Sequence, residues 1–172
     1  MDAEGSEKAL YRVAWKHIDA EEFSQAETVL RQVIDLADPA DPLRFWELSG
    51  LLASVLNSLS RSDEATEMLR RALSEALRAS PSNSAVGVAR YMLANQYLIY
   101  RDPRDALAEA VPVPAGGGQI QCLLHSIAAQ ALWKLGRHNE AQSAAKLAID
   151  AAPTDERRAD LTRDLRDILN AG

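Results

Sequence analysis

The 172-residue sequence has little glycine, few aromatic residues and no long apolar run. Glycine occurs 8 times and aromatic side chains make up 5% of the chain, which argues against a sandwich or barrel built from β-branched and aromatic strands. No run approaches the roughly 18 apolar residues that a membrane-spanning helix needs. Residues 1–8 are too polar for a signal-peptide core. The sequence therefore predicts no membrane contact.

Cysteine and positive charge are also scarce. The single cysteine, Cys122, excludes an internal disulfide, so the chain fits a reducing compartment and we expect a cytoplasmic location. A formal net charge of −6 leaves no basic excess to neutralise phosphates, and we expect no nucleic acid partner. The acidity is uneven, because residues 1–41 hold ten Asp or Glu against four Lys or Arg.

What the sequence has in plenty is 30 alanines and 23 leucines, both strong helix formers. Four segments align on a pair of alanines twelve residues apart, and a short polar break lies inside each pair. A small residue on each of two antiparallel helices lets their backbones approach closely, so each pair predicts a helical hairpin. The pairs are Ala14/Ala26, Ala53/Ala65, Ala94/Ala106 and Ala129/Ala141.

Local signals refine the four segments. Asp102-Pro103 predicts an N-cap followed by proline at the first helical position, and Gly136 suits a helix C-terminus. The second segment predicts a long second helix over 63–79, whereas the third has little more than 105–111 before a proline- and glycine-rich stretch. Prolines that end the second helices separate the segments, at Pro39, Pro42, Pro81 and Pro153.

The tail over 155–170 predicts one further helix. Its apolar stripe consists of Leu161, Leu165, Ile168 and Leu169. The opposite face is charged, which is what a terminal cap on a helical repeat needs.

The pattern resembles the tetratricopeptide repeat family. The fourth segment matches best, through Ala128-Ala129, Leu132, Leu135-Gly136, Ala141 and Pro153, and lies 35 residues after the third. The resemblance implies an all-α, right-handed superhelical solenoid of antiparallel helix pairs. We expect a single domain with repeats at about 7–39, 43–81, 84–118 and 119–153 and a capping helix at 155–170.

Residues that could carry chemistry are few. His17, His125 and His138 lack the spacing of metal ligands, and Cys122 lies among leucines as a small packing residue. The glycines at 116–118 lack the strand and the Lys-Ser/Thr of a phosphate loop. We therefore expect no enzymatic activity, no metal and no cofactor.

The resemblance also implies that the first helix of each repeat lines a concave groove. The stripes facing it combine aromatic and amide side chains, which suit contact with a peptide. Packing of Trp15 and Trp133 between neighbouring first helices stays open as an alternative. The basic clamp with which some members of the family hold a C-terminal carboxylate has no match here. The groove residues are Lys8, Tyr11, Arg12, Trp15, Asn57, Tyr91, Asn95, Gln130, Trp133 and Lys134.

The leading functional hypothesis is a non-enzymatic module that binds a peptide or helix of another protein in this groove. Two alternatives remain. One is a scaffold that forms a homodimer through the uncapped end of the first repeat. The other is a small-ligand or peptide sensor domain of a larger regulatory system, with a pocket between the short third-repeat helix and the glycine connector.

Overall fold

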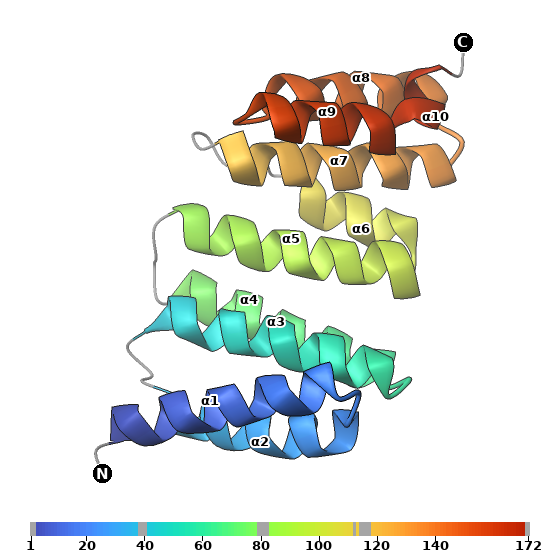
Figure 1. Cartoon of the computed structure of the whole chain (residues 1–172). Coiled ribbons are helices and arrows are strands. Elements are labelled where there is room, and N and C mark those ends of the chain that lie inside the picture. The colour runs from blue at the N-terminus through green and yellow to red at the C-terminus, as the bar shows by residue number, and fades with distance from the viewer. Residues whose placement is uncertain (1–2, 38–40, 79–82, 112, 114–117, 171–172) are drawn as a thin grey trace. The chain divides into compact units, whose positions relative to one another are not determined.

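A computed structural model describes residues 3–37, 41–78, 83–111, 113 and 118–170, and all regular structure in these ranges is helical. The predicted all-α class is therefore confirmed (Figure 1). The predicted breaks at Pro39 and Pro81 and the connector 114–117 lie outside the described residues. The helices are α1 (Ala3–Asp19), α2 (Phe23–Leu36), α3 (Pro42–Ser58), α4 (Ser62–Arg78), α5 (Asn83–Tyr100), α6 (Pro103–Ala110), α7 (Gly118–Lys134), α8 (His138–Asp150), α9 (Asp155–Asp164) and α10 (Arg166–Leu169).

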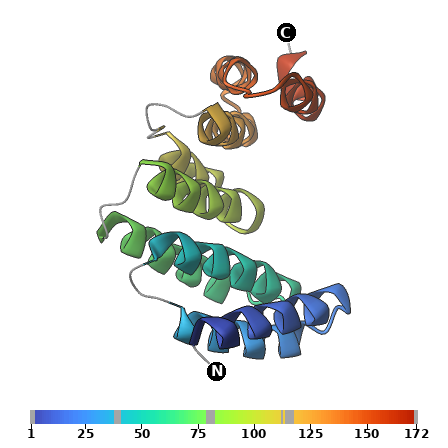
Figure 2. The ribbon, with the colours of Figure 1, turned by 60° about the vertical axis from the view of Figure 1, so that its left-hand side comes forward.

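The chain divides into two compact units, Met1–Pro81 and Ser82–Gly172, here called unit 1 and unit 2. Unit 1 consists of the helix pairs α1/α2 and α3/α4, and α2 also packs against α3. Unit 2 consists of α5/α6 and α7/α8, with α6 packed against α7, followed by α9 and α10. Each of the four predicted hairpins is thus a pair of packed helices. In Figure 2 the axes of α7, α8 and α9 of unit 2 point nearly toward the viewer, so these helices appear as three separate rings.

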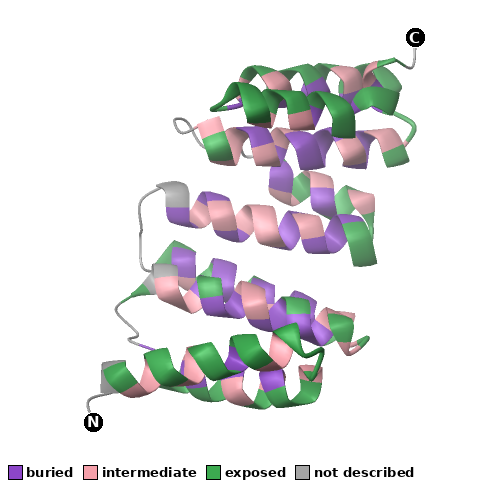
Figure 3. Cartoon of the chain, in the orientation of Figure 1, coloured by how far each residue is buried: buried purple, intermediate pink, exposed green. Residues whose placement is uncertain are grey.

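The alanine pairs lie where the two helices of each hairpin meet. All eight are buried, and seven of them have no exposed surface at all. These seven are Ala14, Ala26, Ala65, Ala94, Ala106, Ala129 and Ala141. Large side chains one turn away fill the space beside them, as Leu30, Leu56 and Leu69 do in unit 1. In Figure 3 buried positions recur along α3, α4 and α7, whereas α1 is mostly exposed or half-buried.

The turn inside three of the four pairs has the same backbone. The residue two positions after the first helix has a positive φ, 57° at Glu21, 60° at Ser60 and 75° at Gly136. In the fourth pair, Gly136 N–H donates to the carbonyl of Trp133 at 3.0 Å, and Arg137 N–H donates to that of Leu132 at 3.0 Å. These two bonds define a Schellman motif, and the other two turns repeat them.

The third pair turns differently and has a short second helix. The Asp102 carboxylate accepts a hydrogen bond from Arg104 N–H at 2.8 Å, so the predicted N-cap before Pro103 is confirmed. α6 has 8 residues and α4 has 17, in agreement with the predicted short and long second helices.

The predicted cap is present, but it is not one continuous helix. The backbone leaves helical values at Leu165, with φ −100° and ψ 11°, and divides the tail into α9 and α10. Both helices contact α8. The bend keeps Leu161, Leu165 and Ile168 buried against the last pair, and Leu169 is half-buried at the outer side. Periodicity alone did not predict the break, because the stripe keeps helical spacing across it.

Candidate functional site: the first-helix faces

The unit 1 face consists of Tyr11, Trp15, Arg44 and Glu47 on α1 and α3. The Tyr11 hydroxyl donates to Glu47 Oε1 at 3.1 Å, and the Arg44 guanidinium lies 4.3 Å from the centre of the Tyr11 ring. Trp15 meets Tyr11 edge-on, with ring centroids 6.3 Å apart and an interplanar angle of 85°. Hydrogen bonding and cation–π attraction therefore orient Tyr11.

Arg44 joins the two first helices of unit 1. Its Nε donates to Glu7 Oε1 on α1 at 2.7 Å, and its Nη1 donates to Glu47 Oε2 at 2.8 Å. Burial lowers the pKa of Arg44, but the hydrogen bonds to both carboxylates outweigh this, so the pKa lies above its usual value. Sequence reasoning missed Arg44 and Glu7 as parts of this face. The spacing of three residues between Arg44 and Glu47 places both on one side of α3, and this could have indicated that Arg44 belongs to the face.

Of the predicted groove residues in unit 1, Trp15 is the large apolar side chain that stays accessible. It is 41% exposed, so it is not buried between neighbouring first helices. Lys8 and Arg12 are exposed on α1, and Asn57 is half-buried near the end of α3. An exposed tryptophan held by an ordered tyrosine gives this face an apolar contact with a defined orientation.

The unit 2 face consists of Tyr91, Asn95 and Gln130 on α5 and α7, all half-buried. Within the described ranges the side chains of Tyr91 and Asn95 make no hydrogen bond. Gln130 Nε2 donates to Ser126 Oγ at 3.3 Å, which leaves its amide oxygen available. Both helices run in the same direction (Figure 1). Lys134 meets Leu98 across them, so Gln130, one turn earlier, lies at the level of Asn95.

The other two predicted residues of unit 2 have structural contacts. Lys134 Nζ donates to the Leu98 carbonyl at 2.9 Å, near the C-terminus of α5, where a positive charge is favourable. Trp133 lies against His138 at the start of α8, with ring centroids 4.4 Å apart. It therefore packs on the turn of its own helix pair.

The other two histidines and the cysteine have contacts that are explained by local structure. His17 Nδ1 lies 2.6 Å from Glu22 Oε2 in the first turn, and burial lowers the pKa of His125. Cys122 is buried, and its thiol donates to the Gln119 carbonyl at 3.1 Å. Among the described residues, no group of three or more His, Cys, Asp or Glu side chains is placed to hold a metal ion.

Residues 124–155, which cover most of α7, all of α8 and the start of α9, match the family model for the tetratricopeptide repeat. This segment is similar to a tetratricopeptide repeat. The resemblance inferred from the alanine pairs is thereby confirmed, and the matched residues lie within the segment that fitted the repeat pattern best. Proteins with tetratricopeptide repeats bind other proteins, so the class of protein-interaction module is supported for this chain.

A solved structure confirms the fold of the repeat protein. The structure named MamA AMB-1 has a TM-score of 0.52 to this chain, is 21% identical to it, and covers 98% of this chain and 87% of its own. At this identity the similarity concerns the fold alone. No curated protein sequence matches the chain. No helix among the described residues is long and apolar enough to cross a membrane.

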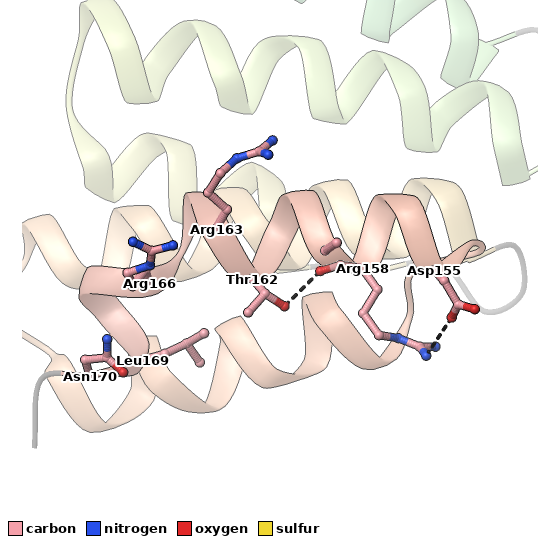
Figure 4. Close-up of a pocket in the computed structure, with 8 residues that line it drawn as sticks. Asp155, Arg158, Thr162, Arg163, Arg166, Leu169 and Asn170 are labelled. Carbon is pink, nitrogen blue, oxygen red and sulfur yellow. Dashed lines mark hydrogen bonds and ion pairs between the residues drawn. The ribbon is translucent and has the colours of Figure 1, made fainter.

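The cap after the tetratricopeptide repeat has a shallow hollow of its own, of about 570 Å³, on the outer side of α9 and α10. Arg158 pairs with Asp155 at 3.2 Å, and the Thr162 hydroxyl donates to the Arg158 carbonyl at 2.8 Å, as Figure 4 shows. Arg163 pairs with Asp160 at 2.6 Å. Because these guanidinium groups already have carboxylate partners, the hollow is a mixed-charge outer surface of the cap.

Proposed function

We propose that this protein is a non-enzymatic module whose first-helix faces bind an extended segment of a partner protein. The unit 2 face holds the main chain of such a segment. The unit 1 face, taken by itself, receives an apolar side chain of a partner. The proposal extends the general role of the repeat in protein interaction to particular residues.

The observation that carries the proposal is the pair Tyr91 and Asn95. Both side chains are half-buried and make no hydrogen bond within the described part of the chain, so their polar atoms are available to a partner. Asn95 can donate to and accept from a peptide group at the same time. The free amide oxygen of Gln130, at the same level on α7, adds an acceptor for a peptide N–H.

The unit 1 face supports the proposal through Trp15. Tryptophan and tyrosine dominate binding energy at protein interfaces because they bury a large area at a small cost in side-chain entropy. Tyr11 is fixed by Glu47 and Arg44, so the ring beside Trp15 is already ordered before a partner binds.

The test compares two variants with four substitutions each in quantitative capture from a lysate of the source organism. The groove variant carries Trp15→Ala, Tyr91→Ala, Asn95→Ala and Gln130→Ala. The control carries Gln32→Ala, Leu36→Ala, Lys146→Ala and Leu147→Ala, which are exposed positions on second helices. Circular dichroism confirms that both variants fold.

We expect the groove variant to recover the partner at least about tenfold less well than the wild type, since interface tryptophans and tyrosines contribute about 2 kcal/mol or more. The control should recover it normally. Equal recovery by the groove variant and the wild type would rule out binding at these faces.

A further inference from the structure

An ion-pair cluster joins the second helices of unit 1. Arg61, just before α4, donates to Glu64 through Nε and Nη2, and to Glu27 of α2 through Nη1 at 2.5 Å. Arg31 donates to the other carboxylate oxygen of Glu27 at 2.8 Å. A single arginine at the start of a second helix thus holds two carboxylates, one of them from the preceding repeat.

Unit 2 keeps half of this cluster. In the register of the alanine pairs, Arg137 occupies the position of Arg61, and Glu140 occupies that of Glu64. Arg137 donates to Glu140 through the same two atoms, Nε at 2.7 Å and Nη2 at 2.6 Å. The local half of the arrangement is therefore identical in the two units.

The other half is replaced by apolar residues. Leu107 stands where unit 1 has Glu27, and Val111 stands where it has Arg31. Within the described residues, Nη1 of Arg137, the atom that corresponds to the donor for Glu27, has no acceptor. Unit 2 consequently presents an arginine without its second carboxylate, next to exposed apolar side chains.

A hollow of about 630 Å³ lies at this place, between α6 and the turn that joins α7 to α8. Its floor is apolar and includes Val111, which is 60% exposed. The side chain of Arg104 makes no ion pair in the part of the chain that the structure describes, so two guanidinium groups border the hollow. The residues that line it are Arg104, Leu107, Ala108, Val111, Leu135 and Arg137.

We propose that this hollow is a second docking site, which takes a partner-protein segment with a leucine-like side chain next to a carboxylate. The aliphatic side chain covers Leu107 and Val111. The carboxylate binds Nη1 of Arg137 and the Arg104 guanidinium, in the position that the Glu27 carboxylate has in unit 1. The Arg104 guanidinium has no ion-pair partner among the described residues, and Arg137 keeps Nη1 without an acceptor there beside its pair with Glu140. These donors favour an anionic occupant, and the exposed apolar floor favours an amphipathic one.

Methyl NMR of the full chain tests the site with two synthetic tetrapeptides. Acetyl-Glu-Leu-Leu-Glu-amide carries the proposed chemistry, and acetyl-Gln-Leu-Leu-Gln-amide is its neutral counterpart. We expect saturable shifts of the Leu107, Val111 and Leu135 methyl groups at millimolar acidic peptide. Binding of the neutral peptide should be about fivefold weaker, as expected for loss of partly exposed ion pairs.

Leu107→Glu is the decisive variant, because it restores the carboxylate of unit 1 and should abolish these shifts at Val111 and Leu135. Leu147→Glu is the matched control, since Leu147 is a 51% exposed leucine of α8 outside the hollow, and it should bind the peptide normally. The proposal is overturned by equal affinity for both peptides, by the absence of saturable shifts, or by unchanged binding in Leu107→Glu. Methyl shifts that depend on protein concentration alone would overturn it in favour of a second copy of this chain.

Discussion

Glycine occupies one of the three equivalent left-handed turn positions, at Gly136, whereas Glu21 and Ser60 occupy the other two. A left-handed backbone costs an L-residue about 1–2 kcal/mol. The three turns nevertheless make the same hydrogen bonds. Packing of the two helices of each pair therefore imposes the turn, and the local sequence only modifies its cost.

This difference predicts opposite effects of substitution at equivalent positions. Gly136→Ala should lower the free energy of unfolding by about 1–2 kcal/mol, with a smaller loss for Gly136→Asn, because asparagine tolerates this conformation. Glu21→Gly should raise it by about 0.5 kcal/mol, since relief of strain exceeds the added chain entropy. Urea unfolding measures both. Stabilisation by Gly136→Ala would contradict the assignment of the turn.

Glu27 makes part of the stability depend on pH. Burial raises the pKa of this carboxyl, but hydrogen bonds from Arg31 and Arg61 and their charges outweigh the burial, so the pKa lies below 4.5. Because the pKa of Glu27 is lower in the folded state than in the unfolded state, the stabilisation is complete above about pH 4.5. It is lost as the pH falls through the folded-state pKa.

We therefore expect Glu27→Gln to reduce the loss of stability on acidification below that pH. Arg61→Gln should reduce it as well, because it removes a hydrogen bond to the same carboxylate. Urea unfolding at a series of pH values from neutral to acidic measures the dependence. The same dependence in the wild type and in Glu27→Gln would show that the cluster does not contribute.

At the scale of elements, the start of α7 lies against the end of α8. A Cβ atom at Gly118 would lie 2.6 Å from the Ala151 carbonyl oxygen, a backbone atom that cannot move independently. The close approach is possible because residue 118 has no side chain. Glycine at this position therefore sets how closely α7 approaches the segment between α8 and α9.

Gly118→Ala should accordingly destabilise the protein by about 1–3 kcal/mol, the usual range for overpacking. Gln119→Ala, at the adjacent exposed position, serves as the control and should change the free energy of unfolding by less than about 0.5 kcal/mol. Thermal unfolding followed by circular dichroism compares them. Equal stability of the two variants would mean that α7 can shift freely at its start.

At the scale of the whole molecule, the division between α4 and α5 separates no helix from its hairpin partner. Stability in helical repeats comes mainly from contacts within a repeat and with its neighbours. We expect fragments 1–81 and 82–172 each to fold alone, with cooperative thermal transitions and helical circular dichroism spectra. A fragment without a cooperative transition would show that its unit depends on the other.

The proposed homodimer through the first pair has little apolar surface at its disposal. Leu48 of α3 packs against Val33 of α2 and against Ala37, and Leu52 and Val55, at helical spacing from it, are buried as well. Their equivalents on α1 are Ala9, Val13 and Lys16, all exposed. Because Ala9 is small and Lys16 is charged, stacking on this side of α1 would bury little apolar surface.

The sequence by itself determined the four helix pairs, their contact alanines, the long α4 and the short α6. These features depend on residues near one another in the chain, through helical periodicity, proline and small-residue spacing. The sequence did not predict the break at Leu165, because the apolar stripe keeps helical spacing across the bend.

Only the tertiary structure decided which polar side chains of the faces have partners. Arg44 joins Glu7 to Glu47 across two helices, and Lys134 binds a carbonyl of α5, whereas Asn95 makes no side-chain bond among the described residues. It likewise showed that Leu107 and Arg137 line the same hollow. The contacts of Arg44 with Glu7 and of Lys134 with Leu98 join residues 37 and 36 positions apart, so the packing of neighbouring helices sets them and local pattern does not.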